Sequence, residues 1–194
     1  MIDYIIGIDE AGRGPLAGPV SVGICIAPVD FDFTIFKNLK DSKKLSEKRR
    51  VEVLAQMKEL QAAKTINFSV ALVSNKVIDD KGIVFAITSA IKALLGKINI
   101  EPHKVKILLD GGLRAPEEYI YQETIIKGDE KEPVISLASI AAKITRDVHM
   151  VKLAKDYLEY GFEIHKGYGT KKHIEMIKKN GLSIVHRRSF CKSF

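Results

Sequence analysis

Two adjacent carboxylates, Asp9 and Glu10, directly follow an apolar stretch near the start of this 194-residue chain. Two acids side by side at the edge of a core are costly unless a cation neutralises them. Neighbouring side chains on a strand point to opposite faces, so both acids reach one site only if the backbone turns there. Gly12 and Gly14 make such a turn easy. The pair therefore predicts a metal site; the alternative is a solvated acidic turn.

Three further aspartates could complete such a site. Asp110 ends another apolar run, Asp129 closes a Lys-Gly-Asp turn, and Asp147 lies well inside a long helical stretch. The simpler interpretation of Asp110 and Asp129 is an ordinary turn residue. For Asp147 it is an ion pair along a helix face. Local sequence alone leaves open which of Asp129 and Asp147 belongs with the other acids.

The types of these side chains indicate which metal they would hold. Carboxylate oxygens are hard ligands that suit Mg²⁺ or Mn²⁺, and the sequence has no His/Cys cluster of zinc type. Two such ions about 4 Å apart can stabilise both the attacking and the leaving oxygen of an in-line phosphoryl displacement. Because the acids alone bind weakly, we expect metal occupancy to depend on substrate.

A glycine-rich stretch, residues 12–18, follows the acidic pair. Its glycines let the backbone approach a ligand, and its N–H groups could meet phosphate or sugar oxygens. No Gly-Lys-Ser/Thr follows, so it is not the phosphate-binding loop of nucleotide triphosphatases, and that class of enzyme is disfavoured. The alternative is a tight turn between two strands.

Three segments concentrate basic residues. Residues 41–50 place lysines and arginines at a helix start, where a phosphate contact and a solvated helix end both fit. Residues 165–173 hold Tyr168 between glycines, where its ring could meet a sugar or a base, or could be buried in the turn. Residues 186–190 could form a basic patch or a C-terminal cap.

Composition narrows the class of protein. A net charge of +7 favours a polyanionic partner, because basic groups gain affinity by displacing counterions from nucleic acid. No apolar run approaches the roughly 20 residues of a membrane span. The N-terminus lacks a signal-type sequence, so we expect a cytoplasmic protein. Cys25 is expected in the core, and nothing demands that it form a disulfide with Cys191.

Apolar patterning predicts both strands and helices. Strands are expected at residues 4–9, 20–27, 65–73, 105–109 and 123–126. Helices are expected at residues 48–60 with Ser46 as N-cap, at 82–95, from Pro133 onward, and before Gly181. The helix from Pro133 has small residues between 136 and 142 that would let it approach a sheet, and its apolar positions reach Val148 and Val151.

This order of elements predicts one α/β domain over residues 1–194. We expect a five-stranded mixed sheet flanked by helices, with a helical, substrate-contacting C-terminal extension at about residues 161–194. Three strands would each present a carboxylate at or just past the C-terminal end, namely Asp9, Asp110 and Asp129. Sites in open α/β sheets form at these ends.

Seven sequence blocks, taken in order, resemble ribonuclease HII. They are GIDEAGRGPLAGPV at 7–20, DSKKL at 41–45, LDG at 109–111, KGD at 127–129, ASIAAK at 138–143, HKGYGT at 165–170 and HRRSF at 186–190. One block would carry little weight, but seven in family order carry much more. A small departure is Leu137, which stands where the family often has Ala; it bears on packing and not on chemistry.

The resemblance implies a ribonuclease H-like fold and a set of functional residues. The catalytic, metal-binding acids would be Asp9, Glu10, Asp110 and Asp129, which makes Asp147 a supporting residue. The residues that sense the 2′-hydroxyl at a ribo–deoxyribo junction would be Gly12, Arg13 and Gly14. Tyr168 would pack on the following sugar, and the block with Ser42 and Lys43 would contact backbone phosphate.

The implied activity is cleavage of RNA in RNA–DNA hybrids and 5′ of single ribonucleotides in duplex DNA. We expect two Mg²⁺ or Mn²⁺ ions, no covalent intermediate, and 5′-phosphate and 3′-hydroxyl products. We also expect a monomer, and the tail at 191–194 does not resemble a sliding-clamp-binding motif.

Two other functions stay open. One is a DNA nuclease or resolvase on the same scaffold. The other is a nucleic-acid-binding module without catalysis, although acids facing a phosphate would repel it.

Overall fold

The computed structural model describes residues 1–37, 39 and 45–192. The first half forms β1 (Tyr4–Ala11), β2 (Val20–Pro28), the 3₁₀ helix η1 (Phe33–Ile35), α1 (Glu47–Ala62), β3 (Asn67–Val73), α2 (Asn75–Lys81) and α3 (Ile83–Leu95). The second half forms η2 (Pro102–Lys104), β4 (Val105–Asp110), β5 (Gln122–Ile125), α4 (Gly128–Lys131), α5 (Pro133–Leu153), α6 (Phe162–His165), α7 (Lys171–Asn180) and η3 (Arg188–Phe190). All five predicted strands are present.

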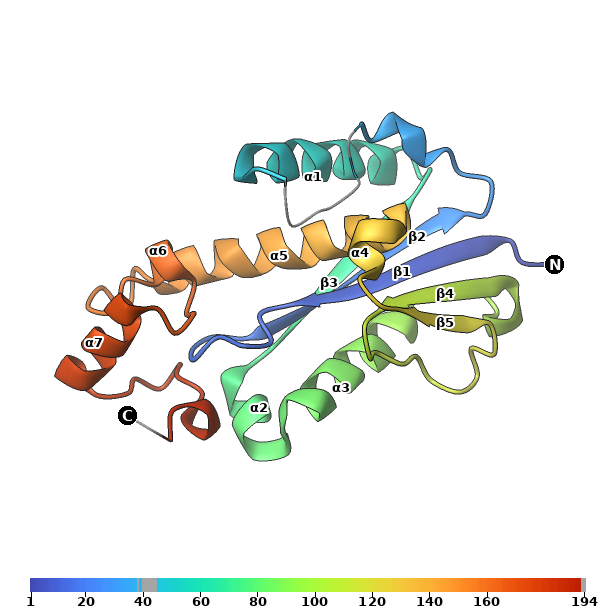
Figure 1. The fold of residues 1–194 in the computed structure, drawn as a ribbon. Helices are drawn as coiled ribbons and strands as arrows, with labels where there is room; N and C mark the ends of the chain where they lie inside the picture. The colour runs from blue at the N-terminus through green and yellow to red at the C-terminus, as the bar shows by residue number, and fades with distance from the viewer. Residues whose placement is uncertain (38, 40–44, 193–194) are drawn as a thin grey trace.

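The strands form one mixed sheet in the order β3-β2-β1-β4-β5, which confirms the predicted fold class (Figure 1). β2 pairs antiparallel with both β1 and β3, as short connections along the chain allow. β4 pairs parallel with β1 and β5. The parallel half brings the C-terminal ends of β1 and β4 to the same edge of the sheet, next to each other.

Helices cover both faces of the sheet (Figure 1). α1 and α5 lie on one face, where Met57 of α1 and Leu137 of α5 belong to one apolar core. α2 and α3 lie on the other face, where Ile87 of α3 packs with Ile8 of β1 in a second core. Cys25 is fully buried in the first core, as predicted, and burial raises the pKa of its thiol to about 12.

Glycines at the centre of the sheet let α5 lie close to it. A Cβ on Gly7 in β1 would lie 2.3 Å from the backbone of Val134, and one on Gly23 in β2 would lie 2.3 Å from the carbonyl oxygen of Ala138. Neither contact is possible, so this separation of helix and sheet requires glycine at both positions. Gly23 pairs across the ladder with Asp9. The close approach therefore brings α5 onto the part of the sheet that carries this carboxylate.

The helices differ from expectation in two respects. α2, α4 and α6 were not predicted; they have seven, four and four residues, too few for a clear apolar period. Val148 and Val151 follow the apolar spacing of α5 but are 48% and 42% exposed. This part of α5 packs through Met150 on the C-terminal segment instead of on the sheet.

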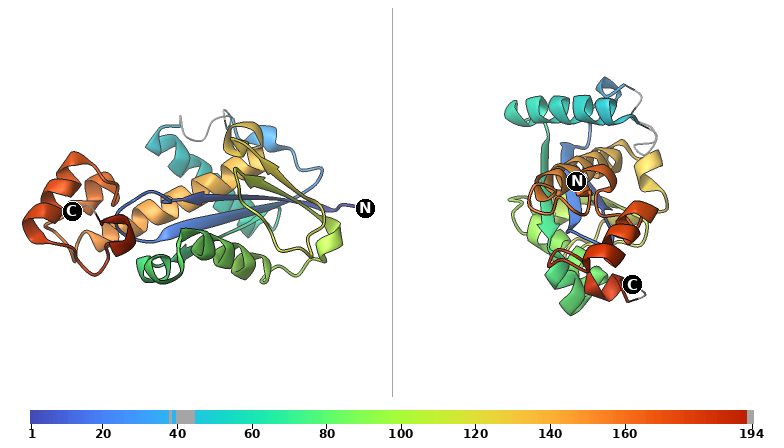
Figure 2. Two further views of the ribbon diagram at one scale, coloured as in Figure 1. Left: turned by 60° about the horizontal axis from the view of Figure 1, so that its bottom comes forward. Right: turned by 90° about the vertical axis from the view of Figure 1, so that its left-hand side faces the viewer.

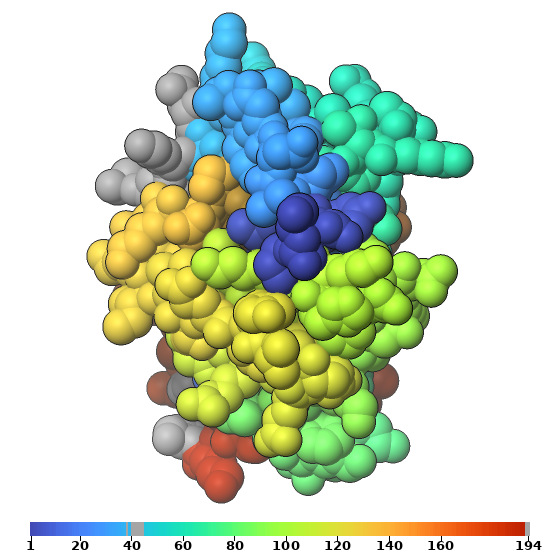
Figure 3. Space-filling model, turned by 90° about the vertical axis from the view of Figure 1, so that its right-hand side faces the viewer, coloured from blue at the N-terminus to red at the C-terminus, as the bar shows by residue number. Residues whose placement is uncertain are grey.

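The C-terminal segment gathers at one end of the sheet, as Figure 2 shows. Phe162 of α6 and Ile177 of α7 join Met150 of α5 and Ala17 of the β1–β2 connection in a third apolar core. Figure 3 shows the opposite end, where the N-terminus lies between the segment after β2 and the loops around β5. No helix of the described residues is both long and apolar enough to cross a membrane.

Candidate active site

Two of the predicted acids lie at neighbouring strand ends. The parallel β1–β4 ladder ends at the pair Ile8–Leu109, and Asp9 and Asp110 are the next residues on their strands. The expected backbone turn at Asp9–Glu10 is absent, because β1 stays paired with β2 through Ala11. Asp9 and Glu10 nevertheless line one cleft. β4 stops pairing with β1 at Ile8, so the edge of β1 is open from Asp9 onward.

This cleft has a volume of about 480 Å³ and brings together residues far apart in the chain. It is lined by Asp9, Glu10, Ala11, Gly12, Arg13, Gly14, Arg50, Asp110, Ser139, Ile140, Lys143 and Tyr168. Seven of the site residues predicted from the sequence therefore meet at one place: Asp9, Glu10, Gly12, Arg13, Gly14, Asp110 and Tyr168. They come from β1, from the connection after it, from β4 and from the loop before α7.

Asp9 is 3% exposed. Its Oδ1 accepts a hydrogen bond from the backbone N–H of Glu10 at 2.7 Å, and the Ser139 hydroxyl of α5 also bonds its side chain. Burial, and then the negative charges of Glu10 and Asp110, raise the pKa of Asp9 to about 8, outweighing these hydrogen bonds. An anionic Asp9 is thus unfavourable here unless positive charge is added.

Glu10 has one engaged and one unengaged oxygen. Its Oε1 lies 3.1 Å from Nη1 of Arg13, while Oε2 is buried and accepts no hydrogen bond from any described residue. Burial raises the pKa of this carboxyl and Arg13 lowers it. A buried carboxylate oxygen without a donor, beside two further acids, fits a hard divalent cation.

Asp129 is not among the residues that line this cleft. It is fully buried in the first turn of α4, and it lines a neighbouring cavity together with Phe36 and Ser136. Among the described residues, no three acidic, imidazole or thiol side chains are close enough together to hold a metal ion. The assignment of Asp129 to the metal site stays a prediction.

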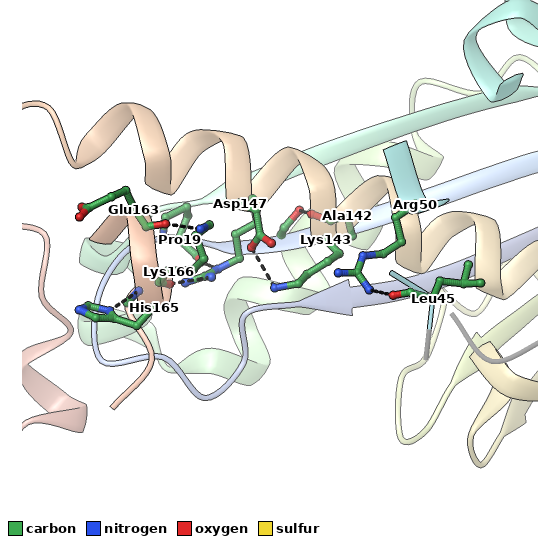
Figure 4. A network of polar contacts seen from close by, with 12 residues as sticks. Pro19, Leu45, Arg50, Ala142, Lys143, Asp147, Glu163, His165 and Lys166 are labelled. Atoms are coloured by element: carbon green, nitrogen blue, oxygen red, sulfur yellow. Dashed lines mark hydrogen bonds and ion pairs between the residues drawn. The ribbon is translucent and has the colours of Figure 1, made fainter. Parts of the chain in front are cut away.

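Positive side chains flank the acids on α1 and α5. Lys143 of α5 and Arg50 of α1 both line the cleft and point to the same region in Figure 4. Arg50 donates to the carbonyl oxygen of Leu45 at 2.5 Å. Lys143 Nζ lies 2.9 Å from Oδ1 of Asp147, which confirms the helix-face ion pair expected of that aspartate.

The glycine loop, residues 12–18, leads from β1 towards the C-terminal segment. Gly12 has a φ of +87°, a backbone conformation that favours glycine. Gly14 is exposed, and a Cβ placed on it would meet no atom within 4 Å. No described residue therefore demands glycine at position 14.

Tyr168 is 39% exposed and lines the cleft, so its interpretation as a buried turn residue is wrong. Lys143 Nζ lies 5.7 Å from the centre of its ring. An aromatic face with cations beside it can pack on a sugar or a base.

Other predicted contacts fall elsewhere. Ser42 and Lys43 lie outside the described residues, as do the last two residues of the tail at 191–194. The surface patch considered for residues 186–190 is wrong for His186 and Arg187, which are 1% and 0% exposed.

Three residues at the site were not predicted. Ser139 entered only as a small helix residue, yet it bonds Asp9. Arg146 and Arg187 are both fully buried and bond the glycine loop. The one signal for Arg146 was its position between Ala142 and Met150 on one face of α5, and a charged residue on a helix is far more often exposed to solvent.

Comparison with known proteins agrees with these features. The family model for ribonuclease HII matches residues 6–193. The ribonuclease HII of Endomicrobium trichonymphae is 44% identical over 186 residues, covering 96% of this chain and 84% of its own. That of Caldicellulosiruptor bescii is 43% identical over 190 residues, covering 98% and 87%.

Solved structures show the same fold. The ribonuclease HII of Archaeoglobus fulgidus, solved in a complex with PCNA, superposes with a TM-score of 0.73 at 26% identity, covering 95% of this chain and 93% of its own. With the family model spanning nearly the whole chain, this protein belongs to the ribonuclease HII family and is a divalent-metal-dependent endoribonuclease of the ribonuclease H type.

Proposed function

We propose that this protein cleaves RNA in RNA–DNA hybrids and cuts 5′ of single ribonucleotides embedded in duplex DNA, leaving 5′-phosphate and 3′-hydroxyl ends. The main support for the proposal is that one cleft is lined both by carboxylates and by residues that could contact a sugar. Carboxylates suited to a divalent cation lie there with a glycine loop and an exposed tyrosine suited to reading a sugar. Membership of the family supports the same activity.

The proposed metal ligands are Asp9, Glu10 and Asp110, with Asp129 as the fourth. When bound, two Mg²⁺ or Mn²⁺ ions would supply the positive charge that activates water and stabilises the leaving oxygen. Asp9 would then lose the proton that burial favours, because the cations outweigh the repulsion from its acidic neighbours. Ser139 and the N–H of Glu10 orient Asp9 for this role.

The glycine loop and Tyr168 are proposed to recognise the ribonucleotide junction. The absence of a side chain at Gly14 leaves room for a sugar to approach the backbone. Arg13 is held near the cleft by Glu10 and is 53% exposed, so it can reach a substrate. Groups built to bond a hydroxyl discriminate strongly against a sugar that lacks it, because they are then left unpaired.

Basic residues are proposed to hold the phosphate backbone without reading sequence. Lys143 and Arg50 lie at the cleft, and α7 exposes Lys171 and Lys172 at its N-terminal end. The C-terminal extension would thus contact substrate, as would Ser42 and Lys43. A monomer located in the cytoplasm stays part of this proposal.

The test compares two duplexes that differ in a single 2′-hydroxyl. One contains one ribonucleotide and the other is all DNA, and each is offered to the protein with Mg²⁺ and with Mn²⁺. We expect cleavage of the first only, on the 5′ side of the ribonucleotide. Equal cleavage of both would contradict junction recognition, and binding without cleavage under either metal would indicate a non-enzymatic module.

A further inference from the structure

Two arginines beside the glycine loop are buried without a carboxylate partner among the described residues. Arg146 of α5 and Arg187 near the C-terminus are both 0% exposed, and neither lies within ion-pair distance of an acid in the described residues. Burial lowers the pKa of both guanidinium groups, and the charge of Arg146 helps to lower that of Arg187, to about 9. Buried cations are expensive, so the hydrogen bonds that hold them must be numerous.

Every one of those hydrogen bonds goes to a backbone carbonyl oxygen. Arg187 donates to Gly12 at 2.7 Å, to Arg13 at 2.9 Å and to Gly18 at 2.9 Å. It therefore holds both ends of the glycine loop from one planar group. A lysine could not reach three carbonyls in this way, because its donors radiate from a single atom.

Arg146 connects two segments that are far apart in the chain. It donates to Ala17 at 3.2 Å and Pro19 at 2.9 Å on one side, and to Lys166 at 2.9 Å on the other. Figure 4 shows Pro19 and Lys166 side by side near α5. Lys166 begins the short loop that leads to Tyr168, so one guanidinium bonds the segments that carry both proposed reading elements.

The same side chain fills the space between those elements. A Cβ on Gly12 would lie 2.0 Å from Nε of Arg146, so the loop lies directly against the guanidinium. On its other side, Cζ of Arg146 lies 5.6 Å from the centre of the Tyr168 ring. Arg146 thus separates the glycine loop from the tyrosine by a fixed distance.

We propose that Arg146 is a positioning residue that holds the glycine loop and Tyr168 at the relative position needed to recognise the junction. Arg187 holds the glycine loop alone. This inference rests on the function proposed above. A site that recognises a single hydroxyl group tolerates little displacement of its residues, and shifts of about 1 Å can lower rates about 100-fold. Neither arginine is among the residues that line the cleft.

The experiment is a double-mutant cycle between Arg146→Lys and Tyr168→Ala. Values of kcat and KM are measured on the duplex with one ribonucleotide, well below each variant's melting temperature. Lys152→Gln, which removes an exposed charge from the same helix, is the matched control and keeps wild-type kinetics. Calorimetry of Mn²⁺ binding checks that the acids are intact.

We expect Arg146→Lys to lower kcat/KM by about 10- to 100-fold with unchanged Mn²⁺ affinity. In the Tyr168→Ala background its effect should shrink to a few-fold at most, because the partner it positions is gone. Arg187→Lys should also lower kcat/KM, but by the same factor in both backgrounds. If Arg146→Lys does not fold, Arg146→Gln takes its place in the cycle.

Equal losses from the Arg146 variant in both backgrounds, or wild-type kinetics in a folded variant, would overturn the positioning role. A wild-type protein that cuts all-DNA duplex equally well would instead overturn the proposed function. The two failures are therefore distinguishable within one set of measurements.

Discussion

The carboxylate of Asp110 accepts a hydrogen bond of 2.6 Å from the backbone N–H of Gly128. This bond connects the C-terminal end of β4 to the first residue of α4, and Asp129 is the next residue in that helix. Gly128 has little freedom there, because a Cβ on it would lie 2.6 Å from Cδ1 of Ile135. One oxygen of Asp110 is thus used by the fold, and the other is free to serve the cleft.

This geometry makes Asp110→Asn a clean probe of charge. The amide oxygen can still accept from Gly128, so the fold and melting temperature should be close to wild type. The negative charge that would hold a cation is lost, and kcat should fall by at least about 100-fold. Rates on the single-ribonucleotide duplex and a thermal melt measure both effects. Near-normal activity would contradict the assignment of Asp110 to the metal site.

Asp129 and Asp147 are the two candidates for the fourth acid of the metal site, and the same substitution in each allows a direct comparison. We expect Asp129→Asn to lose most activity and Asp147→Asn to keep it. The Lys143–Asp147 pair joins partly exposed groups, so its loss should lower stability by only about 0.3–0.5 kcal/mol. Urea unfolding and cleavage rates of both variants decide the matter. The reverse ranking of activities would move the fourth acid to α5.

The glycine loop offers two substitutions with opposite expectations. Gly14→Ala should leave the melting temperature unchanged, because no atom lies near the new methyl group, but should raise KM for the ribonucleotide duplex. Gly12→Ala should lower the unfolding free energy by at least about 1 kcal/mol, since its φ is +87° and Arg146 fills the space. A Gly14→Ala protein with wild-type KM would show that no substrate atom approaches there.

A chain of hydrogen bonds through two buried histidines predicts sensitivity to acid. His173 Nδ1 lies 2.9 Å from the carbonyl oxygen of Tyr168, and its Nε2 lies 3.1 Å from Nε2 of His186. Ser183 Oγ lies 2.8 Å from the other ring nitrogen of His186. The chain is satisfied when Ser183 donates to His186, His186 to His173 and His173 to Tyr168, with both rings neutral.

Burial lowers the pKa of both histidines to about 4. Between pH 6.5 and 4 the unfolded chain therefore binds more protons than the folded one, and stability falls as the pH falls. The raised pKa of Asp9 has the opposite sign in this window. Urea unfolding of an Asp9→Asn, Glu10→Gln variant at pH 7 and pH 4.5 removes the opposing contribution of these two acids. His149 and His165, whose pKa burial also lowers, add to the loss of stability with the same sign. We expect a loss of at least about 1 kcal/mol; equal stability at the two pH values would rule the mechanism out.

The sequence predicted what depends on local pattern. β1 and β4 are apolar runs that lead to acids, and the parallel pairing of the two strands places Asp9 and Asp110 next to each other. Asp129 could be chosen over Asp147 only by resemblance to the family. Its burial in a four-residue helix depends on contacts between distant segments, which no local pattern encodes.

The buried arginines mark the limit of sequence-based prediction more sharply. A charged residue on a helix usually indicates a solvent-exposed position. Arg146 instead bonds three backbone carbonyls, and two of them, Ala17 and Pro19, lie more than a hundred positions earlier in the chain. Carbonyls are present at every residue, so no side-chain pattern identifies those that will accept. Only the assembled fold brings them to Arg146.

The long helix α5 also fixes the distance between two parts of the proposed site. Ser139 bonds Asp9, a proposed metal ligand, and Arg146, seven residues further along, bonds the segments proposed to recognise the sugar. At about 1.5 Å per residue these two positions are separated by about 10 Å of rigid rod. The distance between the bond that is cut and the sugar that is recognised would then be set by the rise per residue of α5. Inserting one residue between them would rotate Arg146 by about 100° away from the carbonyl oxygens it bonds, so the proposed recognition of the sugar should be lost.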